Sequence, residues 1–181
     1  MPGVALALAT TPAAQAGGAG GGASVTLANF FAQLYAGVRD DFTGTLGFKF
    51  TVGGSDVTVH ALGRSVNGSL SSSHQVGLWT VAGSLVASVT VGPSSPVDVL
   101  GYAYEELGSP VVLTAGGVYV IGSEEVASGG DLWCDSLDIS NHSAIVTVNN
   151  SRFSVGSFGF PAADYGGADT SYVPPTFFTA A

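Results

Sequence analysis

Apolar and polar side chains alternate with a period of two in several short stretches of this chain, most clearly in residues 45–52, 57–62 and 85–91. Successive side chains of an extended strand point to opposite faces, so this pattern is typical of strands with one buried face. Turn residues such as Gly53-Gly54 and Gly116-Gly117 separate the stretches, because glycine supplies the positive φ angles of tight turns. The spacing predicts an all-β domain, an antiparallel β-sandwich of jelly-roll-like form.

The same pattern predicts which residues fill the sandwich and where other strands lie. Further strands are expected near residues 76–81, 97–104, 111–113, 118–122, 144–148, 153–160 and 172–178. The residues expected inside are Phe48, Phe50, Val59, Leu78 or Trp79, Leu85, Val89 and Tyr119. Of the two neighbours, Trp79 is expected to fill the core while Leu78 points the other way. Pro110 is expected to start a strand, where its missing N–H is not needed.

Residues 1–42 differ from the rest of the chain and are predicted to form an extended N-terminal arm in front of a domain at residues 43–181. The glycine-rich run 17–22 cannot order itself, because fixing each residue costs roughly 1–2 kcal/mol. Large apolar side chains follow at helical spacing, which fits a short helix or an edge strand. They dock either on the domain's own core or on a neighbouring subunit. The residues expected to form this assembly anchor are Phe30, Phe31, Leu34 and Tyr35.

The start of the chain also imitates a secretory signal. Apolar residues 4–8 are followed by the small-x-small motif Ala14-Gln15-Ala16. No Lys or Arg precedes the apolar residues, so an uncleaved arm is favoured over a signal. No run of about 18 apolar residues occurs, so no membrane-spanning helix is predicted.

The charge content is low and acidic. Only 9% of the residues are charged, whereas globular proteins carry about 25%. Small uncharged residues must therefore cover the surface, which is common in extracellular and virion proteins. The net charge is −9, and the four basic residues, Arg39, Lys49, Arg64 and Arg152, are scattered. Nucleic acids and anionic membranes require clustered Lys and Arg, so neither is an expected partner.

The residue types that carry out chemistry do not converge at catalytic or metal-binding spacing. His60, His74 and His142 form no local metal pair, and no Gly-x-Ser-x-Gly motif occurs. The single Cys134 is expected to be a buried core residue. We therefore expect no enzyme, no catalytic residue and no obligatory metal or cofactor. Acidic residues leave Ca²⁺ open as an alternative, with the candidates Asp40-Asp41, Glu105-Glu106, Glu124-Glu125, Asp131 and Asp135.

Several aromatic side chains are candidates for stacking on sugar rings, because an aromatic face offers a flat apolar surface. The candidates for glycan stacking are Tyr102, Tyr104, Trp133, Tyr165 and Tyr172. In a β protein such residues also serve as core residues or cross-strand partners, so both roles are open for each of them.

Five short motifs occur in an order that resembles a known family. They are Leu46-Gly47-Phe48-Lys49-Phe50, the strand 74–79 with Gly77-Leu78-Trp79, the strand 83–90, the hairpin 110–120, and the closing aromatic residues from Phe160 to Phe178. The order resembles β-sandwich modules designated as the domain of unknown function numbered four thousand and eighty-two, over about residues 43–178. The resemblance implies a β-sandwich in large secreted bacterial proteins, often near carbohydrate-active or adhesive domains, and implies no activity. This chain departs from the pattern in being expected to be free-standing, with an apolar arm in front.

Together these features favour a non-enzymatic structural surface protein of an assembly. A phage virion decoration or tail-associated protein, anchored by its arm at the virion surface, is expected. Its partners are then other structural subunits, including copies of itself in a homo-oligomer. The alternative, favoured by the resemblance and the signal-like start, is a secreted bacterial adhesion or carbohydrate-binding module at a cell surface, with a cell-surface glycan as its partner.

Overall fold

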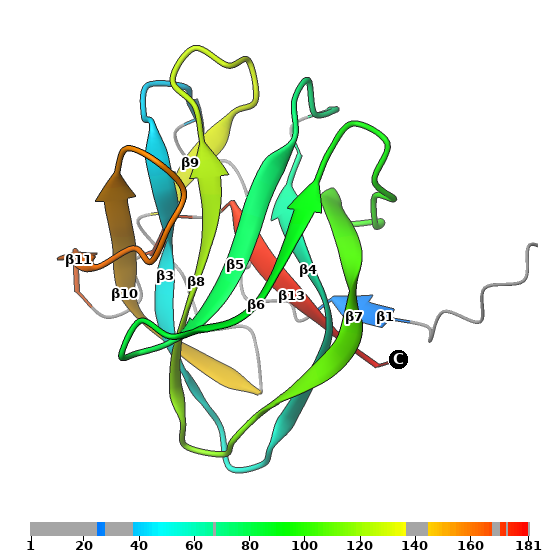
Figure 1. Ribbon diagram of the computed structural model, residues 1–181, viewed down its shortest axis with the longest axis vertical. Coiled ribbons are helices and arrows are strands. Elements are labelled where there is room, and N and C mark those ends of the chain that lie inside the picture. Colours follow the sequence, from blue (N-terminus) through cyan, green and yellow to red (C-terminus); the bar gives the residue numbers. More distant parts are fainter. Residues whose placement is uncertain are drawn as a thin grey trace, which may run out of the picture.

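The computed structural model describes residues 25–27, 38–66, 68–136, 145–167, 171–172 and 174–180. Within these ranges every regular element is a β-strand, and every strand pair is antiparallel (Figure 1). The strands form two main sheets and a third, small sheet. The prediction of an all-β antiparallel sandwich is therefore confirmed.

The larger sheet has six strands in the order β11-β10-β3-β8-β5-β6. They are β3 (Gly44–Val52), β5 (His74–Thr80), β6 (Leu85–Val91), β8 (Val118–Glu125), β10 (Val146–Val155) and β11 (Ala163–Tyr165). The early strand β3 thus lies between β10 and β8, both of which come much later in the chain. Such non-local pairing is typical of Greek-key connections in sandwiches.

The second sheet has four strands in the order β1-β13-β4-β7, and the small sheet has the order β12-β9-β2. The four strands are β1 (Val25–Leu27), β4 (Val57–Ser65), β7 (Tyr102–Leu113) and β13 (Pro175–Ala180). The three strands are β2 (Val38–Arg39), β9 (Trp133–Ser136) and β12 (Ser171–Tyr172). In Figure 1, β10 and β11 lie at the left margin of the molecule and β7 lies at the right.

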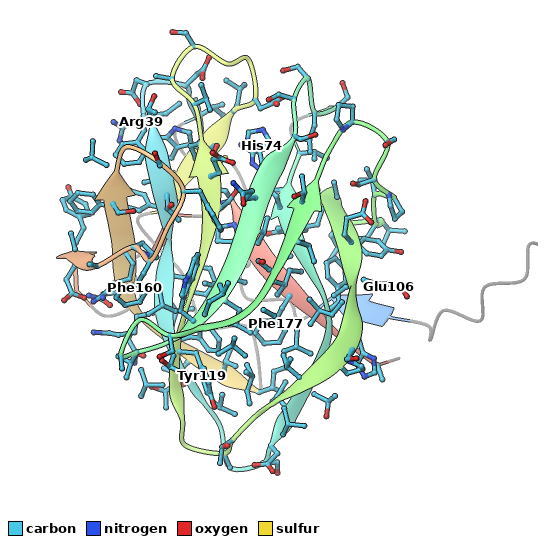
Figure 2. All side chains as sticks on the ribbon, viewed as in Figure 1. Arg39, His74, Glu106, Tyr119, Phe160 and Phe177 are labelled. Atoms are coloured by element: carbon cyan, nitrogen blue, oxygen red, sulfur yellow. The ribbon has the colours of Figure 1, made fainter. Side chains whose placement is uncertain are left out.

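The core lies between the two main sheets. Phe48 and Phe50 of β3, Val59 of β4 and Phe177 of β13 are fully buried there, and the rings of Phe50 and Phe177 are 5.7 Å apart across the sheets. Figure 2 shows Phe177 in the middle of the molecule. Burying each such side chain contributes roughly 1.5–3 kcal/mol. Val89 and Tyr119 are partly buried against this core, as the alternation predicted.

The expectation for Leu78 and Trp79 was wrong in direction. Leu78 belongs to the core between the sheets, whereas Trp79 lies on the outer face of the six-stranded sheet. Trp79 is nevertheless buried, because the loop between β10 and β11, residues 156–162, folds back over that face (Figure 1). We call this loop the strap. Its rings Phe158 and Phe160 lie 5.5 and 6.3 Å from Trp79.

Leu85 was expected in the core, but it is 56% exposed. The reason is a β-bulge in β6. Leu78 pairs with Ala87, and the next residue of β5, Trp79, pairs with Leu85, so Val86 is an extra residue. A bulge shifts the alternation by one residue. Val86 therefore packs against the core, and Leu85 is moved to the outer face.

Three predicted strand boundaries also change. Pro110 does not start a strand but lies inside the long edge strand β7. The pairing is irregular there: Glu106 pairs with Ala61 and Val111 pairs with Val59, so the four residues 107–110 lie opposite the single residue His60. An edge strand tolerates proline because its outer N–H groups need no partner. The predicted strands 97–104 and 153–160 are shorter than expected, because 97–101 form a loop and 156–160 belong to the strap.

Parts of the predicted arm contribute strands to the sheets. β1 pairs with β13, and β2 pairs with β9, so residues before position 43 take part in sheet pairing. The predicted anchor residues lie outside the described residues, and their role stays a prediction. They are Phe30, Phe31, Leu34 and Tyr35. The described part of the chain contains no helix that is long and apolar enough to cross a membrane.

Candidate functional site

An ion pair inside the sandwich joins the two main sheets. Nε and Nη2 of Arg64 on β4 donate to Oε1 and Oε2 of Glu125 on β8, at 3.2 and 2.5 Å. Nη1 of Arg64 also donates to the carbonyl oxygen of Ser65 at 3.1 Å. Burial raises the pKa of the Glu125 carboxyl, and the charge of Arg64 opposes that rise. The pair is fully buried and serves as an internal crosslink.

A second buried group surrounds His74 at the start of β5. Its Nε2 lies 2.9 Å from Oδ2 of Asp131, and its Nδ1 lies 2.6 Å from the carbonyl oxygen of Glu124. Asp131 also accepts the backbone N–H groups of Ser71 and Ser72, at 2.6 and 2.9 Å. Burial opposes ionisation of Asp131, but these hydrogen bonds outweigh it and hold the pKa of the carboxyl well below its usual range.

This Ser-His-Asp group lacks the geometry of a catalytic triad. In a triad the serine and the aspartate contact opposite nitrogens of the imidazole ring. Here Ser72 Oγ, at 3.4 Å, and Asp131 Oδ2 both lie beside Nε2 of His74, and Ser72 Oγ donates to Asp131 at 2.8 Å. The imidazole is also buried (Figure 2 labels His74). The group therefore latches the loop before β5 to the loop after β8.

A third group lies on the outer face, beside the strap. Oδ1 of Asp164 on β11 accepts hydrogen bonds from Nδ2 of Asn150 and Nη1 of Arg152, each at 2.5 Å, and from Nζ of Lys49 at 3.4 Å. The bonds from Asn150 and Arg152 lower the pKa of Asp164 to about 2. Arg152 also donates to the carbonyl oxygen of Pro161 at 2.9 Å, so this group fastens the strap.

The acidic candidates for Ca²⁺ do not come together as a cluster. No group of three His, Cys, Asp or Glu side chains is arranged to hold a metal ion among the residues that the structure describes. Glu125 and Asp131 are engaged by Arg64 and His74, and Asp41 is paired with Arg39. His142 and the side chain of Asp135 lie outside the described residues. Cys134 is buried in the core, as expected.

Three aromatic residues form a continuous row at the β11 side of the molecule. Tyr165 of β11 and Tyr172 of β12 stack with their centroids 5.8 Å apart and their planes 14° apart. Tyr172 meets Trp133 of β9 edge to face at 5.6 Å. Trp133 is buried, whereas Tyr165 is 58% exposed. We call Tyr165, Tyr172 and Trp133 the aromatic edge; it runs from the core to the surface.

Polar groups lie next to the inner end of the aromatic edge. The guanidinium carbon of Arg39 lies 4.5 Å from the ring centroid of Trp133. Nε and Nη2 of Arg39 donate to the two carboxylate oxygens of Asp41, each at 3.0 Å. The hydrogen bond from Arg39 lowers the pKa of Asp41. Arg39 lies at the upper left in Figure 2. The charged groups of Arg39 and Asp41 therefore lie at the buried end of the aromatic edge, and the exposed ring of Tyr165 lies at its other end.

The structure divides the predicted glycan-stacking residues into two groups. Trp133 and Tyr165 come together through Tyr172. Tyr102 and Tyr104 lie on β7, on the opposite side of the molecule in Figure 1. Tyr104 packs on Phe178 at 4.6 Å, and Tyr102 is buried. Tyr102 and Trp133 are buried and present no ring face to a ligand, which favours the alternative role of core residue for both. Tyr165 is the most exposed residue of the set.

Sequence reasoning missed the contact of Arg39 with Trp133 and the role of Tyr172 as a bridge. Residues 39, 133 and 172 belong to strands that are far apart in the chain, whereas residues 165 and 172 lie on the consecutive strands β11 and β12. The strands β2, β9 and β12 are short, so alternation gives little signal for them. The pairing of β9 with both β2 and β12 is what brings these side chains together.

The comparisons agree with the fold. The family model described as Domain of unknown function (DUF4082) matches residues 35–173. A search of curated proteins finds no match to this chain. The matched range includes β2 to β12, and therefore the buried Arg64–Glu125 ion pair, the buried group around His74, the strap and the whole aromatic edge. It also agrees with the resemblance noted from the motifs at residues 43–178. The chain thus belongs to the DUF4082 family.

Proposed function

We propose that this chain is a non-enzymatic binding module that recognises carbohydrate through the aromatic edge. The observation that carries the proposal is the exposed ring of Tyr165, stacked on Tyr172 at 5.8 Å and braced by the buried Trp133. A braced ring loses little conformational freedom when a ligand stacks on it, which favours binding. The flat apolar face of a tyrosine ring can stack on the C–H face of a pyranose.

The buried polar groups support a role without catalysis. Arg64 pairs with Glu125, and His74 is held between Asp131 and the carbonyl oxygen of Glu124. A catalytic acid, base or nucleophile must reach the substrate, and these side chains are enclosed. The resemblance to modules in secreted bacterial proteins supports a place outside the cell, at a cell surface or in a secreted assembly.

A glycan array with the full chain tests the proposal. Wild type is expected to bind at least one class of glycan, and Tyr165→Ala is expected to weaken that binding by about tenfold, since stacked rings contribute roughly 1 kcal/mol or more. Leu85→Ala is the matched control, because Leu85 is equally exposed at the far edge of the same sheet. Equal loss in both variants would contradict the proposed site.

A second candidate function is a structural subunit of an assembly such as a phage particle. The observation that favours it is the apolar loop, residues 96–101, whose Val99 is 100% exposed. Val97 and Leu100 beside it are half exposed. Oδ1 of Asp98 accepts the N–H groups of Leu100 and Tyr102, at 3.0 and 2.9 Å, so the loop is held in one shape. Adjacent exposed aliphatic side chains are a common mark of an interface.

Sedimentation of the full chain over a range of concentrations tests this second function. A homo-oligomer that forms through the apolar loop is expected to sediment faster as concentration rises, and Val99→Asp is expected to abolish the increase. The Val99 side chain makes no buried contact, so the substitution should leave the fold intact, as circular dichroism can check. Concentration-independent sedimentation of a monomer would count against self-assembly through this loop.

A further inference from the structure

The basic residues of this chain limit the ligands that the aromatic edge can accept. The sequence contains four Lys and Arg residues, and each of them lies within ion-pair distance of a carboxylate. The pairs are Arg39 with Asp41 at 3.0 Å, Lys49 with Asp164 at 3.4 Å, Arg64 with Glu125 at 2.5 Å, and Arg152 with Asp164 at 2.5 Å. Every Lys and Arg thus has a carboxylate partner, although Lys49 and Arg152 share the single carboxylate of Asp164.

The charged residues near the aromatic edge form two separate groups. Asp164 precedes Tyr165 in β11 and takes hydrogen bonds from Lys49 and Arg152. At the inner end, Arg39 is paired with Asp41, and Asp40 adds one more carboxylate next to them. Asp164 pairs with Arg152, and Tyr165 pairs with Ser151, so the Asp164 group lies on the outer face of the sheet and Tyr165 points to the opposite face, where Arg39 lies at the inner end of the edge. Farther away, the chain has a large acidic excess and a net charge of −9.

This charge pattern disfavours an anionic ligand both in direct contact with the edge and at long range. A uronate, sulfate or sialyl group at the edge would find Arg39 already bound to Asp41, and would have to displace that carboxylate to form an ion pair. At longer range, a negatively charged polymer is repelled by the acidic excess of the whole chain. A neutral sugar meets neither obstacle, because its hydroxyl groups can accept from and donate to charged pairs that stay intact.

We propose that the ligand of the aromatic edge is a neutral pyranose polymer, and that acidic glycans are excluded. This inference rests on the proposed carbohydrate-binding function and adds the ligand class. The sugar stacks its C–H face on Tyr165, and its hydroxyl groups reach the polar rim that Arg39 and Asp41 form. Exclusion of acidic glycans follows from the pairing of Arg39 with Asp41 and from the acidic excess of the chain, and it needs no steric clash.

Affinity electrophoresis of the full chain in gels that contain matched polysaccharides tests the inference. Hydroxyethyl cellulose and carboxymethyl cellulose share one backbone and differ in charge, and a neutral galactan with its sulfated counterpart forms a second pair. Neutral mannan is a further probe. EDTA in the gel prevents Ca²⁺ from bridging the protein to anionic chains. We expect retardation by at least one neutral polymer and none by the charged partner of that polymer.

Variants locate the binding. Tyr165→Ala is expected to reduce the affinity for the neutral polymer by about tenfold. Tyr165→Phe keeps the ring and is expected to retain the affinity for the neutral polymer. Leu85→Ala is expected to bind as wild type does. Retardation by an anionic polymer as strong as by its neutral partner overturns the neutral-ligand inference and leaves carbohydrate binding standing. Retardation by none of the polymers overturns both, and full binding by Tyr165→Ala overturns the site.

Discussion

Arg64 and Glu125 are 61 residues apart in the sequence, yet they form a bidentate ion pair with side chains that are 0% and 1% exposed. The two residues belong to different sheets, so the pair ties the halves of the sandwich together. Its desolvation is unfavourable, and its geometry offsets that penalty only while both partners are present. The importance of the pair for stability therefore shows when one partner is removed and the other is left buried without a partner.

Single and double substitutions at this pair should differ in size. Glu125→Leu or Arg64→Met alone is expected to lower the free energy of unfolding by about 3–5 kcal/mol, because the remaining buried charge loses its partner. The double variant Arg64→Met with Glu125→Leu is expected to lose much less, since no unpaired charge remains. Urea denaturation of all four proteins measures the difference. A double variant that loses the sum of both single effects would show that the pair has no coupling.

The stability of the protein should fall in acid. The pKa values of Asp131 and Asp164 are lowered on folding, so both carboxylates stabilise the fold above the ordinary aspartate pKa near 4. That stabilisation is lost as the pH falls through the folded pKa, which is about 2 for Asp164. Glu125, with its raised pKa, has the opposite sign and makes the loss smaller.

Asp164→Asn isolates one part of this acid dependence. At neutral pH the variant is expected to be less stable by under about 1 kcal/mol, because the carboxylate is 56% exposed and solvent screens its pairs. Near pH 2 most of this difference is expected to have disappeared, since wild-type Asp164 is then about half protonated. Thermal melts from pH 7 to pH 2 follow the convergence. Parallel curves across that range would contradict the assignment.

The packing of the strap against the six-stranded sheet should depend on a row of glycines on the outer face. Gly77 and Gly47 both pair with Gly122, and the strap lies over this row. A Cβ at position 77 would lie 2.3 Å from the Trp79 ring and 2.9 Å from the ring of Phe158. Gly77→Ala is therefore expected to displace the strap and to lower the free energy of unfolding by about 1–3 kcal/mol.

Tryptophan fluorescence and denaturation can follow this change, because Trp79 is one of two tryptophans and lies under the strap. Gly54→Ala is the matched control, since a Cβ there meets nothing within 4 Å. It should leave stability within about 0.5 kcal/mol of wild type. An equally small effect of Gly77→Ala would mean that the strap is not held against the row as described.

Two truncations should separate the strands of the N-terminal region from the residues before them. Deleting residues 1–24 keeps β1 and β2 and is expected to leave the unfolding free energy within about 0.5 kcal/mol of the full chain. Deleting residues 1–42 removes the pairing of β1 with β13 and the contact of Arg39 with Trp133, and a loss of about 1–3 kcal/mol is expected. Identical melting temperatures for both truncations would contradict the assignment of β1 and β2 to the fold.

Much of the architecture could be read from alternation. The strands around Phe48, Val59 and Val89 were predicted because each has one buried face, and a period of two is a local property of the chain. The order of motifs pointed to the family for a related reason, since those motifs are turns and core strands. Alternation also placed Phe50 and Tyr119 correctly, and these neighbours on paired strands stack at 6.1 Å.

What alternation could not decide is which face turns inward when both are covered, and where the alternation shifts. Trp79 is buried on the outer face only because the strap returns from beyond β10, and Leu85 is exposed only because Val86 is an extra residue. The packing of the two main sheets decided that Arg64 meets Glu125, and the pairing of β12 with β9 decided that Tyr172 meets Trp133. The sequence determined the strands, since their pattern depends on near neighbours. Only the tertiary structure decided the aromatic edge, because its residues come from strands that meet through long-range pairing.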